Sequence, residues 1–561
     1  MAGVTKSTNP ATGEALAEVP NSDLGRFEES VREARTAQKE WKRKTFSERA
    51  REIAKVKAYL AEHAEECADV IAKCNGKTRM DALATEVLPC IMACDYYAAN
   101  AGSVLAPHTC RGGSILFANK STTVQYTPVG VVGIISPWNY PFSIPFGEVV
   151  MGLMAGNAVL LKVATCTVLC GDFIARCMAA ADFPPGLFQH VVGSGGKVGS
   201  LMLAGQGKGV DKVFFTGSVQ VGKDLMRIAA DSLTPLSLEL GGKDPMIVLE
   251  DADLERAANG ACWAGYQNAG QSCGGVERVY VHSSVFQQFV DILAAKTQAL
   301  RHGVDVDHEV DIGCMTTRSQ LETVKKQVDG AVAEGAVIVA QSQPVGDCSK
   351  GYFYPATLVT NINHDMLLMR EETFGPVIPV MPFDTIEEAV DLANDSDLAL
   401  TSSVWTNNAK LARRISEQIE SGITTVNDHL YTHGMSETPW GGWKYSGLGR
   451  THGEHGLREM CNAKAINTDM VPAWLAPRNI WWYPFSKKTY DGILAGVKFV
   501  APSNVFSWLG SVATLLPFAL GTMLTPWNVE GMPKRSSSAR LLFLAALLLV
   551  PVAIGGAYYA R

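Results

Sequence analysis

Hydrophobic and polar positions follow two alternating periods along most of the chain. Short apolar runs at 130–135 (GVVGII), 158–161 and 213–215 each precede a stretch with helical spacing. Runs of this length are typical of buried parallel strands, and the repeated strand–helix order predicts right-handed crossovers in a doubly wound sheet. A second series begins near Glu239, with its first strand at 246–249. The pattern therefore predicts two α/β domains.

The N-terminal region has helical periodicity instead. Apolar residues recur through 27–41 and again through 53–70, so we expect one helix and then a longer one. Gly76 follows the second segment and is expected to end it as a C-cap.

The C-terminal region contains a long apolar run. Residues 541–560 (LLFLAALLLVPVAIGGAYYA) hold no charge, and twenty helical residues span roughly 30 Å, the thickness of a bilayer core. Residues 506–524 are a second candidate, as a span, a re-entrant piece or a surface segment. Two spans would place Lys534, Arg535 and Arg540 on the far side, against the positive-inside rule. We therefore expect a single transmembrane tail anchor, with the catalytic part facing the cytoplasm.

Composition excludes several functional classes. A chain of 561 residues is too long to fold around one hydrophobic core, so two or more domains are expected. The formal charge of −7 argues against nucleic-acid binding. The 13 cysteines form no CxxC pair, so neither a zinc ribbon nor a disulfide framework is indicated. His452 and His455 have the spacing of a metal pair but lack a third ligand, so we expect surface residues and no metal site.

Candidate catalytic residues lie in two Gly-rich segments and one turn. Cys273 lies in 268–275 (NAGQSCGG), and Glu239 precedes two glycines in LELGGK. A thiol among small residues and a nearby carboxylate suggest a covalent catalyst with its own base, although ordinary buried residues would look similar. Asn139 follows the strand at 130–135, where its amide could donate to an oxyanion or merely satisfy a turn.

Candidate phosphate-binding turns are less specific. The GxGxxG fingerprint is missing, because the run 193–199 (GSGGKVG) places its third glycine, Gly199, one residue late. Gly217 and Ser218 follow a strand and open a helix, where free backbone N–H groups can hold a pyrophosphate. Either segment could equally be a plain strand–helix connection.

Taken together, the motifs resemble the aldehyde dehydrogenase superfamily across about residues 5–465. The resemblance rests on their order along the chain: PWN at 137–139, FTGS at 215–218, LELGGK at 238–243, GQSC at 270–273, EETFGP at 371–376 and PWGGWKYSG at 439–447. The hydrophobic C-terminal extension is similar in layout to fatty aldehyde dehydrogenases.

The resemblance implies a role for each catalytic candidate. Cys273 would attack the aldehyde to give a thiohemiacetal, and Asn139 with the Cys273 backbone N–H would hold the oxyanion. Hydride transfer to a nicotinamide would leave a thioester, and Glu239 would activate water to release the acid. Because relatives that pass the thioester to coenzyme A generally lack this carboxylate, Glu239 favours hydrolysis.

The resemblance also implies a cofactor site. Residues assigned to it are Trp138 beside the cofactor, Lys162 and Thr165 at the adenosine ribose, Gly199, Gly217 and Ser218 at the phosphates, and Glu372 and Phe374 at the nicotinamide ribose and ring. Many NAD-preferring relatives carry glutamate three residues after the lysine, where this chain has Thr165. Both NAD and NADP therefore stay candidate cofactors, and NAD is the favoured one.

The resulting expectation is an α/β enzyme in several parts. We expect a Rossmann-like NAD(P)-binding domain at 1–238, a catalytic α/β domain at 239–429 and a small β oligomerisation flap. The flap would use strands near 115–128 and at 456–470, and a segment at about 430–455 would return to the NAD(P)-binding domain. A membrane-proximal extension (471–540) and the anchor (541–560) complete the chain.

The expected reaction is oxidation of a hydrophobic or aliphatic aldehyde by a homodimer or homotetramer. Two alternatives stay open. One is a semialdehyde dehydrogenase of the same family, for which we cannot place a cation to hold a substrate carboxylate. The other is a non-catalytic membrane scaffold.

Overall fold

The computed structural model describes residues 3–205, 207–472 and 475–525, which form two compact units. The first contains residues up to Ala106 and Tyr126–Ala463, and the second contains Pro107–Gln125 and the chain from Lys464 onward. The predicted anchor at 541–560 lies outside the described residues. The finer division into cofactor, catalytic and oligomerisation domains stays a prediction.

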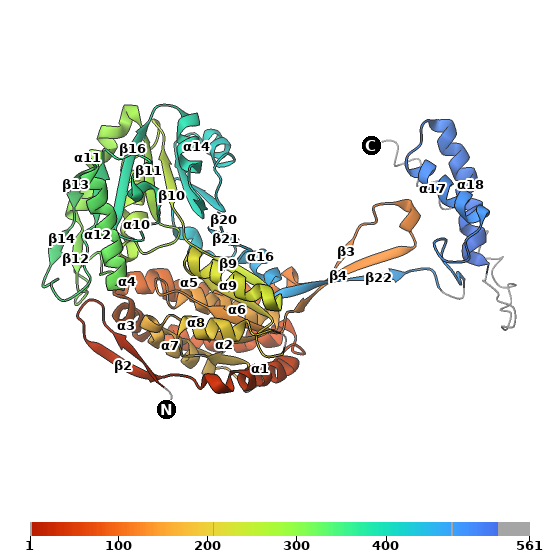
Figure 1. Cartoon of the computed structure of the whole chain (residues 1–561), viewed down its shortest axis with the longest axis horizontal. Helices are drawn as coiled ribbons and strands as arrows, with labels where there is room; N and C mark the ends of the chain where they lie inside the picture. Colours follow the sequence, from red (N-terminus) through yellow and green to blue (C-terminus); the bar gives the residue numbers. More distant parts are fainter. Residues whose placement is uncertain (1–2, 206, 473–474, 526–561) are drawn as a thin grey trace. The chain divides into compact units, whose positions relative to one another are not determined.

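The first sheet of the first unit is doubly wound, as the hydrophobic pattern predicts (Figure 1). Its strand order is β21-β9-β8-β5-β6-β7, and every pair is parallel except β21 with β9. The strands are β5 (Val131–Ile135), β6 (Ala158–Lys162), β7 (Phe188–His190), β8 (Lys212–Thr216), β9 (Leu236–Glu239) and β21 (Gly447–Leu448). The chain reverses direction across the sheet between β5 and β8, so the carboxyl ends of these strands form a topological switch point.

Helices on this sheet connect successive strands. They are α6 (Ser143–Ala155), α7 (Val168–Ala179), α8 (Gly195–Met202) and α9 (Val219–Ser232). Every residue of α6 is buried, and apart from Ser143 and Glu148 the helix is apolar or glycine on all sides, as a fully buried helix requires.

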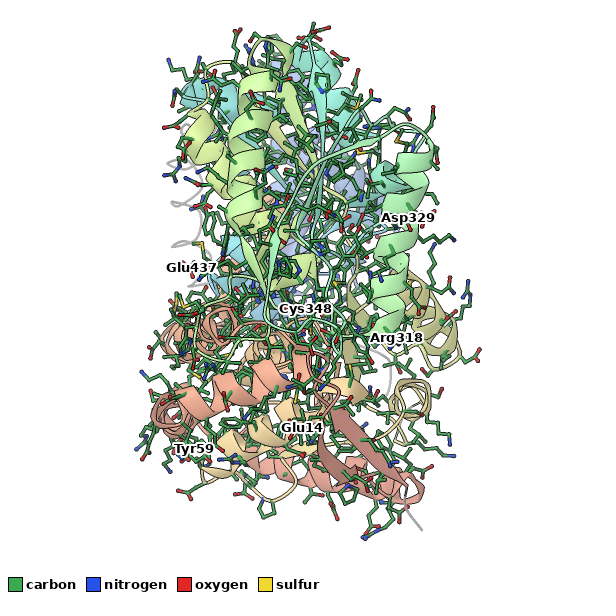
Figure 2. The ribbon with its side chains drawn as sticks, turned by 90° about the vertical axis from the view of Figure 1, so that its left-hand side faces the viewer. Glu14, Tyr59, Arg318, Asp329, Cys348 and Glu437 are labelled. Carbon is green, nitrogen blue, oxygen red and sulfur yellow. The ribbon has the colours of Figure 1, made fainter. Side chains whose placement is uncertain are left out.

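The second sheet has the order β13-β15-β16-β11-β10-β18-β19 and is parallel apart from its edge strand β13. Its strands are β10 (Asp244–Val248), β11 (Val276–His282), β13 (Val337–Gln341), β15 (Thr357–Thr360), β16 (Val377–Phe383), β18 (Thr401–Trp405) and β19 (Ile423–Val426). Helices α10 (Leu254–Tyr266), α11 (Phe286–Ala299), α12 (Arg318–Ala333), α14 (Ile386–Asn394) and α15 (Ala409–Ser416) accompany it. Figure 2 shows α12 on the outside of this layer, with Arg318 and Asp329 along it.

The N-terminal helices differ from the expected pair. The structure has α1 (Phe27–Trp41), α2 (Phe46–Glu62), α3 (Ala64–Asn75) and, after a further turn, α5 (Leu88–Val104). The predicted longer helix is wrong, because the chain leaves helical geometry at His63 (φ −109°, ψ 23°), where α2 ends and α3 begins. Gly76 does end α3, with φ 94°, and a Cβ there would lie 2.5 Å from the Cys314 sulfur.

The second unit combines a small sheet with a helical hairpin. The sheet has the order β22-β4-β3, formed by β3 (His108–Cys110), β4 (Lys120–Pro128) and β22 (Cys461–Asp469). Two helices follow, α17 (Lys487–Val500) and α18 (Val505–Leu524). By length and composition, α18 is the one helix of the described residues that could cross a membrane.

Candidate active site

The predicted catalytic residues meet where the two sheets of the first unit adjoin. Glu239 ends β9, and after a short turn β10 begins at Asp244. Asp244 pairs with Val276 at the start of β11, and Cys273 lies immediately before that strand. A Cβ on Gly242 would lie only 2.2 Å from the Cys273 carbonyl oxygen, so the two turns are in backbone contact. The structure thus places the turns that carry Glu239 and Cys273 side by side.

Cys273 is partly buried against Trp440, Leu400 and Ile423. Burial raises the pKa of its thiol well above the usual range, and the nearby carboxyls of Glu372, Asp244 and Glu239 act in the same direction. The resting protein therefore holds a neutral thiol, and attack on an electrophile requires a proton acceptor.

Glu239 has the environment of such an acceptor. The residue is 4% exposed, and neither carboxyl oxygen has a hydrogen-bond partner among the described atoms. Burial raises the pKa of Glu239 well above its ordinary value, and the charge of Glu148 adds to this shift while Arg450 opposes it. A carboxyl with a raised pKa and free oxygens is suited to accept a proton near neutral pH.

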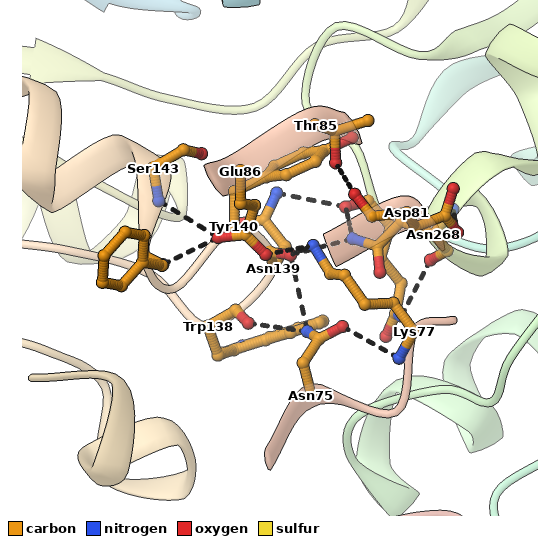
Figure 3. Close-up of polar contacts among 12 residues, drawn as sticks. Asn75, Lys77, Asp81, Thr85, Glu86, Trp138, Asn139, Tyr140, Ser143 and Asn268 are labelled. Atoms are coloured by element: carbon orange, nitrogen blue, oxygen red, sulfur yellow. Dashed lines mark hydrogen bonds and ion pairs between the residues drawn. The ribbon is translucent and has the colours of Figure 1, made fainter. Parts of the chain in front are cut away.

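The backbone of Asn139 is hydrogen-bonded to a buried polar cluster (Figure 3). Its backbone carbonyl accepts hydrogen bonds from Lys77 Nζ at 2.9 Å and Asn268 Nδ2 at 2.8 Å. Its side-chain Nδ2 donates to the Gln271 carbonyl at 3.1 Å, two residues before Cys273. The side-chain amide therefore lies beside the loop that carries the thiol, as an oxyanion donor must.

A fully buried ion pair completes this cluster. Lys77 Nζ lies 2.6 Å from Glu86 Oε1, and Glu86 Oε2 accepts from the backbone N–H groups of Phe142 and Ser143 at 2.7 and 3.1 Å. Lys77 thus binds the carbonyl of Asn139, while Glu86 binds the backbone N–H groups three and four residues later. The hydrophobic pattern did not reveal Lys77 or Glu86, because neither lies in a motif and a buried charge is indistinguishable in sequence from an exposed one.

The loop before Cys273 is strained. Asn268 and Ala269 have φ values of 54° and 53°, and Gly270 has 69°. Left-handed backbone costs a non-glycine residue about 1–2 kcal/mol. A Cβ on Gly270 would lie 2.0 Å from the Gly375 carbonyl oxygen, so glycine is required there. The strain is sustained by the Asn268 side chain, which donates to the carbonyls of Asn139 and Gln271.

The nicotinamide-side candidates adjoin the Glu239 turn. The rings of Trp138 and Phe374 meet edge to face, with centroids 5.5 Å apart. Glu372 Oε1 accepts from the Gly242 N–H at 3.0 Å, and burial raises the pKa of Glu372 to about 8. Glu277, which sequence analysis did not select, accepts from the Phe374 N–H at 2.8 Å and from Lys243 Nζ at 2.7 Å.

The remaining cofactor candidates lie at strand ends of the first sheet. Lys162 ends β6, and burial lowers the pKa of its amine. A Cβ on Gly195, at the start of α8, would lie 3.6 Å from Lys162 Nζ. Gly217 and Ser218 precede α9, and the Ser218 side chain caps that helix by accepting from the Val221 N–H. Two helix N-termini and an amine at the switch point fit a dinucleotide.

Thr165 and Gly199 contribute differently. Thr165 begins a short 3-10 turn three residues after Lys162 and is exposed. Gly199 lies inside α8, where a Cβ would be 3.1 Å from Leu225, so its small size serves the packing of α8 on α9. The structure therefore places Gly199 in a helix interface, away from the free N–H groups at the helix start.

A cavity of about 160 Å³ is lined by Tyr140, the residue that follows Asn139. Its lining includes Pro89, Tyr140, Trp263, Leu430, Tyr431 and His433. His433 stacks on Tyr140 at 5.5 Å and meets Trp440 edge to face at 5.1 Å, and Trp440 packs against Cys273. This cavity is thus linked to the thiol through a chain of ring contacts.

His452 is half-buried, which differs from the expectation of a surface residue. Its ring contacts His433 and Trp440, and burial lowers the pKa of His452 to about 3. His455 is exposed. Within the described ranges, no group of three His, Cys, Asp or Glu side chains could hold a metal ion.

A doubly wound sheet with open strand ends at its switch point, beside a second α/β sheet, is typical of nicotinamide-dependent dehydrogenases. The sequence profile of the Aldehyde dehydrogenase family matches residues 2–466, and the chain belongs to this family. It is an NAD(P)-dependent aldehyde dehydrogenase.

Known proteins similar to this chain differ in the substrates that their names state. The 4,4'-diapolycopene aldehyde oxidase of a Methylomonas species is 34% identical over 494 residues, which cover 88% of this chain and 91% of that protein. A putative succinate-semialdehyde dehydrogenase [NADP(+)] of Mycobacterium ulcerans is also 34% identical, over 84% of this chain and 90% of its own length. The NAD+ complex of an aldehyde dehydrogenase from Bacillus cereus is 33% identical, with a TM-score of 0.78, and covers 83% of this chain and 94% of that chain.

Proposed function

We propose that this enzyme oxidises a hydrophobic, aliphatic aldehyde to its carboxylic acid at a membrane. The mainly apolar and aromatic lining of the cavity at Tyr140 is the observation that supports this substrate class. The membrane location is supported by the uncharged run at 541–560 and by α18. In this arrangement the catalytic unit faces the cytoplasm, and the enzyme acts as a homodimer or homotetramer.

The catalytic cycle follows from the three residues at the sheet junction. The Cys273 sulfur bonds to the aldehyde carbon as its proton passes to Glu239 and from there to solvent, and Asn139 with the Cys273 N–H stabilises the resulting oxyanion. A nicotinamide cofactor, held by the residues described below, would supply the hydride acceptor for oxidation of the Cys273 thiohemiacetal to a thioester. Glu239 then takes a proton from water, the hydroxide attacks the thioester carbon, and the acid leaves as the thiolate is restored.

The cofactor residues would act by positioning. Lys162 and the N-termini of α8 and α9 would bind the ribose and phosphates, and Glu372 and Phe374 the nicotinamide end. Thr165 offers a hydroxyl and no negative charge, so it neither repels a 2′-phosphate nor strongly binds a 2′-hydroxyl. We propose NAD+ as the preferred cofactor, with NADP+ also accepted.

A semialdehyde dehydrogenase is the second candidate, favoured by the name of one group of relatives. A substrate carboxylate needs a cationic partner in a buried site. The described lining of the cavity contains no Lys or Arg, and burial lowers the pKa of its His433 to about 4, so this ring is neutral. The cavity therefore favours an uncharged tail.

The test is an initial-rate panel of aldehydes of graded chain length, including succinate semialdehyde, each with NAD+ and with NADP+. We expect kcat/KM to rise with chain length, since each buried CH₂ contributes about 0.8 kcal/mol. A flat profile, or a preference for succinate semialdehyde, contradicts the proposed substrate. The Cys273→Ala variant should bind cofactor but produce no NAD(P)H, whereas unchanged production would exclude Cys273 as the nucleophile. A parent protein that produces no NAD(P)H with any aldehyde of the panel would favour the scaffold.

A further inference from the structure

The α17–α18 hairpin has two unlike grooves. The helices approach closely, because a Cβ on Gly492 would lie 2.1 Å from the Phe518 ring, and Ala495 and Leu515 are buried at the same contact. Side chains on the two sides of this contact form separate grooves between the helices.

One groove is entirely apolar. Its volume is about 330 Å³, and it is lined by Leu116, Ile480, Trp481, Ile493, Gly496, Val497, Val500, Ala501 and Leu515. The other groove is lined mainly by polar groups, among them Asp491, Lys498, Ser507, Ser511 and Thr514. The hairpin is thus amphipathic as a pair of helices, even though α18 carries no charged residue.

Large aromatic side chains extend the apolar side. Trp481, which lines the apolar groove, is 40% exposed, and Trp482, Tyr483 and Phe485 beside it are 57%, 65% and 63% exposed. Contiguous exposed rings of this kind are unusual on a water-facing surface and common at the membrane–water interface.

The charge of the second unit has the opposite sign to that of the whole chain. Its described residues include seven cations (Arg111, Lys120, Lys464, Arg478, Lys487, Lys488 and Lys498) and two anions (Asp469 and Asp491). The complete chain carries a formal charge of −7. A cationic unit with an exposed apolar groove is complementary to anionic phospholipid, which offers negative headgroups above an acyl interior.

We propose that the α17–α18 hairpin lies in the plane of an anionic phospholipid bilayer, with the apolar groove and residues 481–485 facing the acyl chains. The polar groove faces water. This inference rests on the proposed membrane attachment and specifies how the chain before the anchor meets the lipid.

The geometry distinguishes this arrangement from a span through the bilayer. If α18 crossed the bilayer, the attached α17 would carry Asp491 and Lys498 toward the hydrocarbon, where charges are costly. An in-plane hairpin keeps these charges in water. It also leaves Lys534, Arg535 and Arg540 on the same side as the catalytic unit, as the positive-inside rule favours.

The test uses two single-cysteine substitutions in the full chain, Val497→Cys in the apolar groove and Thr514→Cys in the polar groove. Both positions are exposed in the structure. Each variant is added to preformed phosphatidylcholine–phosphatidylserine vesicles, sedimented with them and treated with a membrane-impermeant maleimide. Alkylation is measured on the peptide that carries the new cysteine, so the 13 native cysteines do not interfere. Each rate is divided by the rate in the same unfolded protein.

We expect the Thr514→Cys thiol to react about ten-fold faster than the Val497→Cys thiol, because only exposed thiolate is alkylated. Equal fast labelling of both positions overturns docking, and equal protection shows that α18 crosses the bilayer. If the full chain does not sediment with vesicles, this result contradicts the proposed membrane attachment as well as the hairpin docking. Aldehyde oxidation assayed in the same samples tests the proposed enzyme activity separately from its membrane geometry.

Discussion

At the scale of single residues, burial raises the pKa of both Cys273 and Glu239, and the direction of the Glu239 shift determines the expected pH dependence. A carboxyl with a raised pKa is protonated at low pH and becomes a base only as the pH rises through that pKa. Aldehyde oxidation should therefore increase with pH well above the ordinary range of a glutamate.

Replacing Glu239 by Gln should remove the base that releases the acid. We expect the first turnover to produce NADH as a burst, while steady-state kcat falls about 10²–10⁴-fold. The profile of kcat against pH should also lose its acidic limb, which is the rise of kcat as Glu239 loses its proton. Rapid-mixing absorbance at a series of pH values provides the measurement. The matched variant is Glu148→Gln, which should keep the limb but shift it to lower pH, since the Glu148 charge contributes to the raised pKa of Glu239. An unchanged limb in Glu239→Gln contradicts the assignment.

Lys77 should matter through Asn139 rather than by contact with substrate. Substituting Lys77→Met leaves Glu86 buried without its partner, at a cost of about 3–5 kcal/mol. We expect a lower thermal transition temperature, a kcat reduced about ten-fold because Asn139 shifts, and an unchanged KM for the cofactor. The double variant Lys77→Met/Glu86→Gln should recover part of the thermal stability.

The control for this prediction is Lys57→Met. Lys57 pairs with Asp95 at the same N···O distance of 2.6 Å, but on the surface. Exposed ion pairs contribute little, so this variant should behave like the parent protein. Equal effects of the two substitutions would show that the buried pair has no special part in holding Asn139.

At the scale of elements, the catalytic residues are brought together by the close approach of two turns. The β9–β10 turn and the loop before β11 touch through Gly242 and the Cys273 carbonyl. Since main-chain atoms occupy both sides of this contact, no side-chain rotamer can relieve an added methyl group.

We therefore expect Gly242→Ala to reduce kcat/KM about 100-fold by displacing the Cys273 loop. Helix α12 offers a control in Gly330, where a Cβ would meet no atom within 4 Å. The Gly330→Ala variant should retain activity and be slightly more stable, because alanine favours a helix interior by up to about 1 kcal/mol. Steady-state rates and thermal unfolding of both variants provide the measurement, and an active Gly242→Ala enzyme would contradict the contact.

At the scale of the whole molecule, attachment and catalysis are expected to be separable. A chain ending at Pro533 lacks the apolar run at 541–560 but keeps both described units. We expect this variant to oxidise aldehydes, and to bind anionic vesicles only weakly and only at low salt. The full chain should sediment with vesicles at any salt concentration. Persistent sedimentation of the shortened chain in high salt would instead assign the anchor to α18.

The amino-acid sequence by itself determined the α/β class and the positions of several core strands, and it predicted the chemistry of the candidate site. Apolar runs such as 130–135 and 213–215 appear as β5 and β8, because a strand buried on both faces needs continuous hydrophobicity. The break at His63 was missed, because helical periodicity continues across it.

Only the tertiary structure decided which groups share an environment. The contact of Gly242 with Cys273, the buried Lys77–Glu86 pair behind Asn139 and the two grooves of α17–α18 join residues far apart in sequence. A sequence records which side chains are present. Burial, and with it the direction of each pKa, depends on the packing of segments that the chain brings together only on folding.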